Sequence, residues 1–100
     1  MQKILFVEDE SALQRAVSNV LVDQGYKIFS AMDGETAIAL AVKELPDLIL
    51  LDLIIPKKDG FAVLTELKQN KATMNIPVII LTNLESNADV EQALALGATT

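Results

Sequence analysis

The sequence contains no cysteine and no histidine. Without cysteine the chain has no disulfide, no thiolate metal ligand and no cysteine nucleophile. Without histidine it has no imidazole metal ligand, no Ser-His-Asp triad and no phosphohistidine of its own. Chemistry on this chain must therefore use carboxylates, hydroxyls, lysines or backbone groups.

Positive charge and long apolar runs are also scarce. The 100 residues include eight Lys and Arg and fourteen Asp and Glu, which give a net charge of −6. Phosphate backbones are bound by clustered cations, so we expect no nucleic-acid binding by this segment. The longest apolar runs, near residues 48–51 and 76–81, are far shorter than a membrane span, and no export signal opens the chain. We expect a cytoplasmic protein with no membrane association.

The residues that are present predict one globular α/β domain over residues 1–100. Hydrophobic residues make up 51% of the chain, and no linker, repeat or low-complexity tract divides it. Short apolar runs rich in branched residues are typical of strands buried on both faces of a parallel sheet. Such runs occupy residues 4–7, 48–51 and 78–81, and a weaker strand is expected at residues 26–30.

Stretches with helical spacing separate these runs. The first carries an apolar stripe from Leu13 to Leu21, opens on a possible capping box formed by Ser11 and Gln14, and stops at Gly25. The other predicted helices run from about residue 33 to before Pro46, over 61–70, and over 86–96 with Gly97 closing the last. The alternating order predicts a layered α/β fold with right-handed crossovers.

Acidic residues follow two of the predicted strands. Glu8 and Asp9 end the first strand, and Asp52 ends the third. In open α/β sheets chemistry collects at the carboxyl ends of the strands, so neighbouring strands would bring these carboxylates together. Packed carboxylates repel unless a cation or proton offsets them, and Mg²⁺ favours such oxygen ligands. The alternative is that Asp9 caps the first helix and Asp52 is a loop residue.

Thr82 adds a hydroxyl at the end of the fourth predicted strand. A threonine there is ordinarily a β-branched structural residue. Three carboxylates and a hydroxyl at one rim, however, outline a phosphoryl-transfer site, in which an aspartate can be the nucleophile and a metal can neutralise the phosphoryl oxygens.

These features resemble the receiver domain of bacterial two-component response regulators. The resemblance covers essentially the whole chain, and it implies a flavodoxin-like fold with strand order 2-1-3-4-5. The motifs that carry it are Glu8-Asp9, Asp52 with the downstream Pro56-x-x-x-Gly60 pattern, Thr82, and Gly97-Ala98.

The resemblance also implies a role for each site residue. Asp52 would be the phosphoacceptor, supplied by the phosphohistidine of a sensor histidine kinase. Asp9, Asp52 and the backbone carbonyl of Ile54 would bind Mg²⁺ directly, and Glu8 would bind it through water. Thr82 would contact the phosphoryl group and act as a switch. Such a domain is a phosphoacceptor switch, with at most self-phosphorylation and self-dephosphorylation, rather than an enzyme.

Family members continue beyond the Gly-Ala pair into a fifth strand and helix, which carry an aromatic switch residue and a lysine that pairs with the phosphoryl group. This sequence stops at Thr100, before both. We therefore expect a C-terminally truncated, three-layer fold with strand order 2-1-3-4. The run at residues 78–81 would then be an exposed edge, and exposed edges recruit another chain, so we expect self-association.

Other functions are open at this point. A receiver fragment that no longer switches could act as a scaffold or self-assembly module, and phosphoryl uptake at Asp52 would separate the two. An aspartate-nucleophile phosphatase is disfavoured because Ile54 stands where that class typically has a second acid. Nucleotide and flavin binding are disfavoured because neither G-x-G-x-x-G nor a P-loop is present.

Overall fold

The computed structural model describes residues 2–52, 60–81, 91 and 94–98. Strands and helices alternate along this part of the chain, as the apolar pattern predicts. The elements are β1 (Lys3–Val7), α1 (Ser11–Asp23), β2 (Lys27–Ala31), α2 (Gly34–Glu44), β3 (Leu48–Leu51), α3 (Gly60–Gln69) and β4 (Val78–Ile80). No helix within these residues is both long and apolar enough to cross a membrane.

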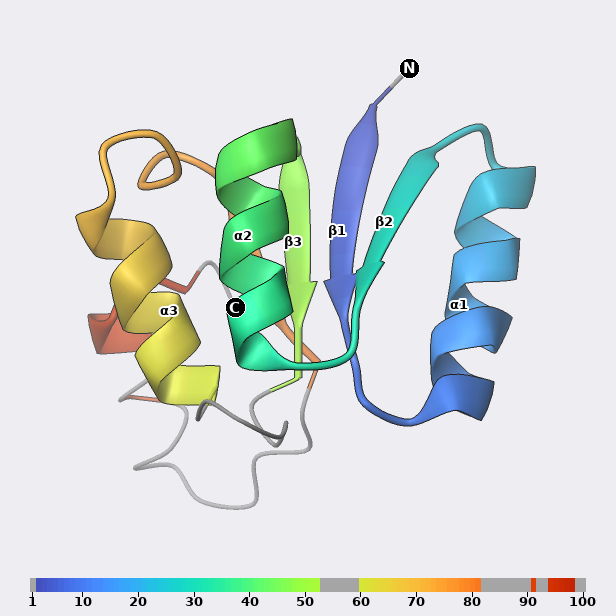
Figure 1. Ribbon diagram of the computed structural model, residues 1–100, viewed down its shortest axis with the longest axis horizontal. Coiled ribbons are helices and arrows are strands. Elements are labelled where there is room, and N and C mark those ends of the chain that lie inside the picture. The colour runs from blue at the N-terminus through green and yellow to red at the C-terminus, as the bar shows by residue number, and fades with distance from the viewer. Residues whose placement is uncertain (1, 53–59, 82–90, 92–93, 99–100) are drawn as a thin grey trace.

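The strands form one parallel sheet in the order β2-β1-β3-β4 (Figure 1). This order confirms the predicted α/β fold class. Across the sheet, Phe6 lies opposite Leu50, and Leu50 lies opposite Ile79. Because all strands run in one direction, their carboxyl ends share one edge of the sheet.

Helices α2 and α3 pack against each other over one face of the sheet, whereas α1 lies on the other side, against β1 and β2 (Figure 1). Most of the buried core lies between the sheet and the α2–α3 layer. Its largest fully buried members there are Leu5, Val7, Ile49, Leu51, Val63, Leu64, Leu67 and Val78.

The second face of the sheet is less completely covered. Phe6 is buried there, but Leu50 and Ile79, which continue its row across the sheet, are partly exposed. On α1, the apolar side chains of Leu13 and Val20 are 42% and 60% exposed. Within the described residues, the prediction of strands buried on both faces therefore holds on the α2–α3 side and only in part on the α1 side.

The predicted capping box at the start of α1 is wrong. Ser11 lies inside the helix, Glu10 is the flanking residue, and no side chain there accepts a capping hydrogen bond. The Gln14 side chain does not bond to the helix start, because its Oε1 accepts from the Ser18 hydroxyl and its Nε2 faces backbone carbonyls instead. The other end of α1 is as predicted: Gly25, with φ of +93°, donates its N–H to the Val22 carbonyl at 2.9 Å.

The later helices match their predicted positions where the structure describes them. α2 begins after Asp33, whose carboxylate accepts a hydrogen bond from the Thr36 N–H at 2.8 Å. α3 starts one residue earlier than predicted. The predicted helix at 86–96 lies mostly outside the described residues. Residues 91, 94 and 95 are helical, and Gly97 follows them with φ of +105°.

Candidate functional site

Backbone pairing continues one residue beyond β1 and β3, and it places two acidic residues at the carboxyl edge of the sheet. The Glu8 N–H donates to the Ala31 carbonyl at 3.0 Å, and the Asp52 N–H donates to the Val7 carbonyl at 3.0 Å. Both side chains therefore start from backbone that the sheet holds in place.

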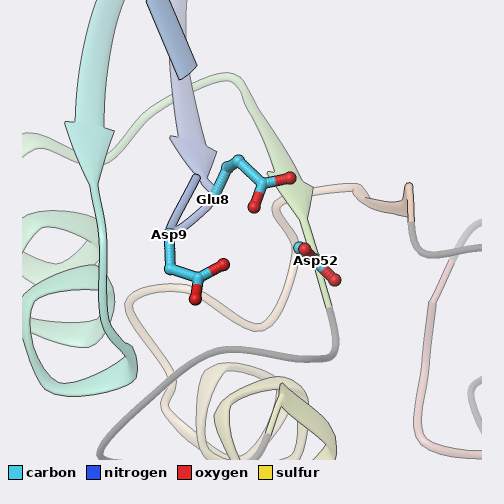
Figure 2. Close-up of side chains that lie close together, drawn as sticks. All are labelled: Glu8, Asp9 and Asp52. Carbon is cyan, nitrogen blue, oxygen red and sulfur yellow. The ribbon is translucent and has the colours of Figure 1, made fainter. Parts of the chain in front are cut away.

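Glu8, Asp9 and Asp52 form the acidic cluster of this protein (Figure 2). One carboxylate oxygen from each lies within 4.8 Å of the others. The side chains of Glu8 and Asp9 point towards Asp52, so the three acids face a common space (Figure 2). Glu8 is only 6% exposed, Asp52 is partly exposed and Asp9 is exposed. The structure thus brings together the three acids that the sequence placed at two strand ends.

Asp9 does not cap α1, so the alternative interpretation of this residue is wrong. Glu10, rather than Asp9, flanks the start of α1, and no side-chain capping bond is formed there. Thr82, Ile54 and Pro56 lie outside the described residues. Gly60 begins α3, and Ala98 is buried in the core.

The electrostatics of the cluster are dominated by Glu8. The pKa of its carboxyl is raised to about 7, chiefly by burial and also by Asp52, through a side-chain hydrogen bond and charge repulsion. A side-chain hydrogen bond with Asp9 acts in the same direction. The Glu10 N–H, which donates to Glu8 Oε2 at 3.2 Å, opposes these effects by stabilising the carboxylate. The Glu8 carboxyl is therefore partly protonated near neutral pH, and this proton offsets part of the repulsion between the packed carboxylates.

A cation can offset the same repulsion, and the donors present fit Mg²⁺. All three side chains offer carboxylate oxygens, the hard ligands that Mg²⁺ prefers. Asp9 and Asp52 are accessible enough to bind an ion that keeps several waters, whereas Glu8 is buried. The chemistry that this arrangement supports is electrostatic: it can bind a hard cation next to an accessible aspartate.

Sequence reasoning missed Gln14. Its spacing to Ser11 predicts a capping box, whereas its buried amide contacts the backbone carbonyls of Phe6, Glu8 and Ala31 next to the acidic cluster. The available signal was a polar side chain between Leu13 and Val17 in the apolar stripe of α1.

Comparison with known proteins identifies the family. The profile of the response regulator receiver domain matches residues 4–100. The response regulator PleD of Caulobacter vibrioides is 43% identical over 96 residues, which are 96% of this chain and 21% of PleD. Among solved structures, the chemotaxis protein CheY4 of Vibrio cholerae gives a TM-score of 0.93 at 32% identity, covering 99% of this chain and 82% of that one. The Mn²⁺-bound response regulator Rcp1 gives 0.86 at 36% identity, covering 99% and 78%.

The chain belongs to the response regulator receiver domain family. Its function is therefore that of a receiver domain in phosphorelay signalling, a switch rather than a conventional enzyme. Receiver domains accept phosphoryl groups from sensor histidine kinases and bind Mg²⁺ at an acidic pocket. The chain spans about a fifth of the length of PleD.

Proposed function

We propose that this chain accepts a phosphoryl group on Asp52 from the phosphohistidine of a sensor histidine kinase, with Mg²⁺ bound at the acidic cluster. The observation that carries the proposal is the cluster itself. Asp52 is a partly exposed carboxylate at the end of β3, and oxygens of Glu8 and Asp9 lie within 4.8 Å. A donor can reach Asp52, while the buried Glu8 cannot serve as the acceptor without rearrangement.

In the proposed step, a carboxylate oxygen of Asp52 attacks the phosphorus of the phosphohistidine. The new bond joins this oxygen to phosphorus, the phosphorus–nitrogen bond breaks, and the imidazole nitrogen keeps the electron pair. The product is an acyl phosphate on Asp52. The chain's own residues hold the acceptor carboxylate in place through the Asp52 N–H bond to Val7 and leave its side chain accessible.

Asp9 and Asp52 would bind the cation directly, with Glu8 bound through water. When present, the cation neutralises charge on the transferred phosphoryl oxygens. The Mn²⁺-bound structure of Rcp1 supports a divalent cation in a protein of this fold. Ile54, through its backbone carbonyl, and Thr82, as phosphoryl contact and switch, complete the proposal from the family resemblance alone.

The test is intact-mass analysis after incubation with Mg²⁺ and phosphoramidate, a small-molecule phosphodonor. We expect wild-type protein to gain the mass of one phosphoryl group and Asp52→Asn to gain none. Glu10→Gln is the matched control, because it removes an exposed neighbouring acid that lies outside the cluster. It should retain uptake. A folded wild-type sample that gains no mass would overturn the proposal and favour the non-switching scaffold.

We also propose that the 100-residue chain associates with itself through β4. Within the described residues β4 is the outer strand on its side of the sheet, and its Ile79 and Ile80 are only partly buried. Leu81, just beyond it, is 48% exposed. An apolar strand with one edge open to pairing favours addition of a second chain.

A further inference from the structure

Gln14 is the buried polar residue of α1, and its amide faces the backbone next to the acidic cluster. The side chain is 6% exposed. Its Nε2 lies 3.1 Å from the Phe6 carbonyl oxygen and 3.4 Å from those of Glu8 and Ala31. Carbonyl oxygens only accept hydrogen bonds, so the NH₂ end must face them. The other end agrees, since Oε1 accepts from the Ser18 hydroxyl at 2.9 Å.

These three carbonyls lie where the pairing between β1 and β2 ends. The Glu8 N–H donates to the Ala31 carbonyl at 3.0 Å, and the chain then turns away towards α1 (Figure 1). At this point, where the pairing of β1 with β2 ends, the Gln14 side chain supplies hydrogen-bond donors to the backbone. It fastens the first turns of α1 to both β1 and β2, and it also gives the Glu8 carbonyl, just past β1, a hydrogen-bond donor.

The Glu8 carbonyl belongs to the peptide unit that joins Glu8 to Asp9. A peptide unit is planar, so holding its oxygen restricts the orientation of the Cα atoms on both sides. We infer that Gln14 is a positioning residue for the acidic cluster, which holds the Glu8–Asp9 peptide so that both carboxylates face Asp52. The inference rests on the proposed function, since it assigns Gln14 to the site that binds the cation and accepts the phosphoryl group.

Gln14 is uncharged and acts on the site through geometry. Removing a residue that hydrogen-bonds to a metal ligand and orients it commonly weakens metal affinity by about 10- to 100-fold. Gln14 orients the backbone of two ligands rather than a ligand atom, so we expect an effect at the lower end of that range.

The test compares Mn²⁺ affinity in matched variants, measured by the electron paramagnetic resonance signal of the free ion. Gln14→Met keeps the side-chain length and removes both donors. Thr73→Val is the control, because the buried Thr73 hydroxyl donates to the Leu67 carbonyl at 2.6 Å before β4 begins, away from the carboxyl edge. We expect Gln14→Met to raise the Kd for Mn²⁺ about tenfold. Thr73→Val should lower the stability and leave this Kd unchanged.

The outcomes separate this inference from the proposed function. If wild-type protein binds Mn²⁺ and accepts phosphoryl on Asp52, and Gln14→Met binds Mn²⁺ equally well, the inference alone is overturned. If folded wild-type protein does not bind Mn²⁺, both the inference and the proposed function are overturned. Should Gln14→Met fail to fold, Ser18→Ala decides, because removing the hydroxyl that donates to Oε1 leaves the Gln14 amide less firmly held against the Glu8 carbonyl. It should weaken Mn²⁺ binding measurably but less than the roughly tenfold expected for Gln14→Met, and an unchanged Kd would overturn the inference.

Discussion

Glu8 is more deeply buried than the other two residues of the acidic cluster. The carboxyl is buried beside Asp52, and burial is the main reason that its pKa rises from the ordinary value of 4.5 to about 7. The folded chain therefore binds a proton that the unfolded chain has already released in this pH range. Protonation of this one residue makes folding stability depend on pH.

We predict that, without divalent ions, Glu8 makes wild-type stability fall as the pH rises from 4.5 to 7. Below 4.5 the carboxyl is protonated in both states, so its contribution is fully present. As the pH rises through 7, the folded state loses this contribution because the proton leaves. Urea unfolding followed by circular dichroism at several pH values measures this slope.

Glu8→Gln cannot titrate, so its stability should increase relative to wild type across that interval. Glu10→Gln, which replaces an exposed acid two residues away, should keep the wild-type slope. Unfolding free energies of Glu8→Gln and wild type that stay parallel from pH 4.5 to pH 7 would contradict the prediction.

The acidic residues could be predicted from the sequence, but the contacts that Gln14 makes could not. Glu8 and Asp52 each follow an apolar run directly, and the parallel arrangement of strands brings such ends together. The role of Gln14 depends on carbonyls from β1 and β2 that become neighbours only after folding. Local spacing to Ser11 instead suggested a cap.

At the scale of elements, two glycines close helical segments in the same left-handed conformation but in different surroundings. A Cβ at Gly25 would have no heavy atom within 4 Å, whereas a Cβ at Gly97 would lie 2.9 Å from Lys68 Cγ. That lysine is not free to move away, because its ammonium donates to the Ile76 carbonyl at 2.6 Å and to the Met74 carbonyl at 3.2 Å.

We predict that Gly25→Ala lowers the free energy of unfolding by about 1 kcal/mol, from the positive φ alone. Gly97→Ala should lower it further, because it adds the contact with Lys68 to the same backbone strain. Thermal or urea unfolding of both variants gives the comparison. Equal losses would show that the Lys68 side chain shifts without cost, contrary to this prediction.

Positions of elements were easier to predict than their ends. The runs at 4–7 and 48–51 are too short and too continuously apolar for surface helices, and they became β1 and β3. The start of α1 differs from the prediction because a serine one residue inside the helix matches the same motif as a serine at the cap. The motif does not encode that offset.

At the scale of the whole molecule, the two faces of the sheet differ. The α2–α3 layer buries Leu5, Ile49 and Val78 completely, while on the α1 side Leu50 and Ile79 keep part of their surface exposed. Among the residues that the structure describes, the apolar exposure on that side and the outer edge of β4 give the physical basis for the proposed self-association.

We predict that the 100-residue chain forms at least a dimer. Light scattering coupled to size-exclusion chromatography gives the mass, and Ile79→Lys, which places a charge on β4, should shift the population towards monomer. The control is Val20→Lys, at a more exposed apolar position on α1. It should leave the mass unchanged if β4 carries the contact. A wild-type sample that is entirely monomeric at every concentration would rule out the proposal.

The backbone bonds that Glu8 and Asp52 make just past the ends of β1 and β3 have a consequence for which changes this fold tolerates. Side chains alternate between the two faces of a sheet. Deleting one residue within β1 would therefore move the side chains before the deletion to the opposite face relative to those after it, and it would turn the Glu8 side chain away from the acidic cluster if the apolar residues kept their faces. Exchanging one apolar residue for another of similar volume would leave the acid where it is. The acidic cluster therefore depends more on the number of residues in each strand than on which apolar residues they are.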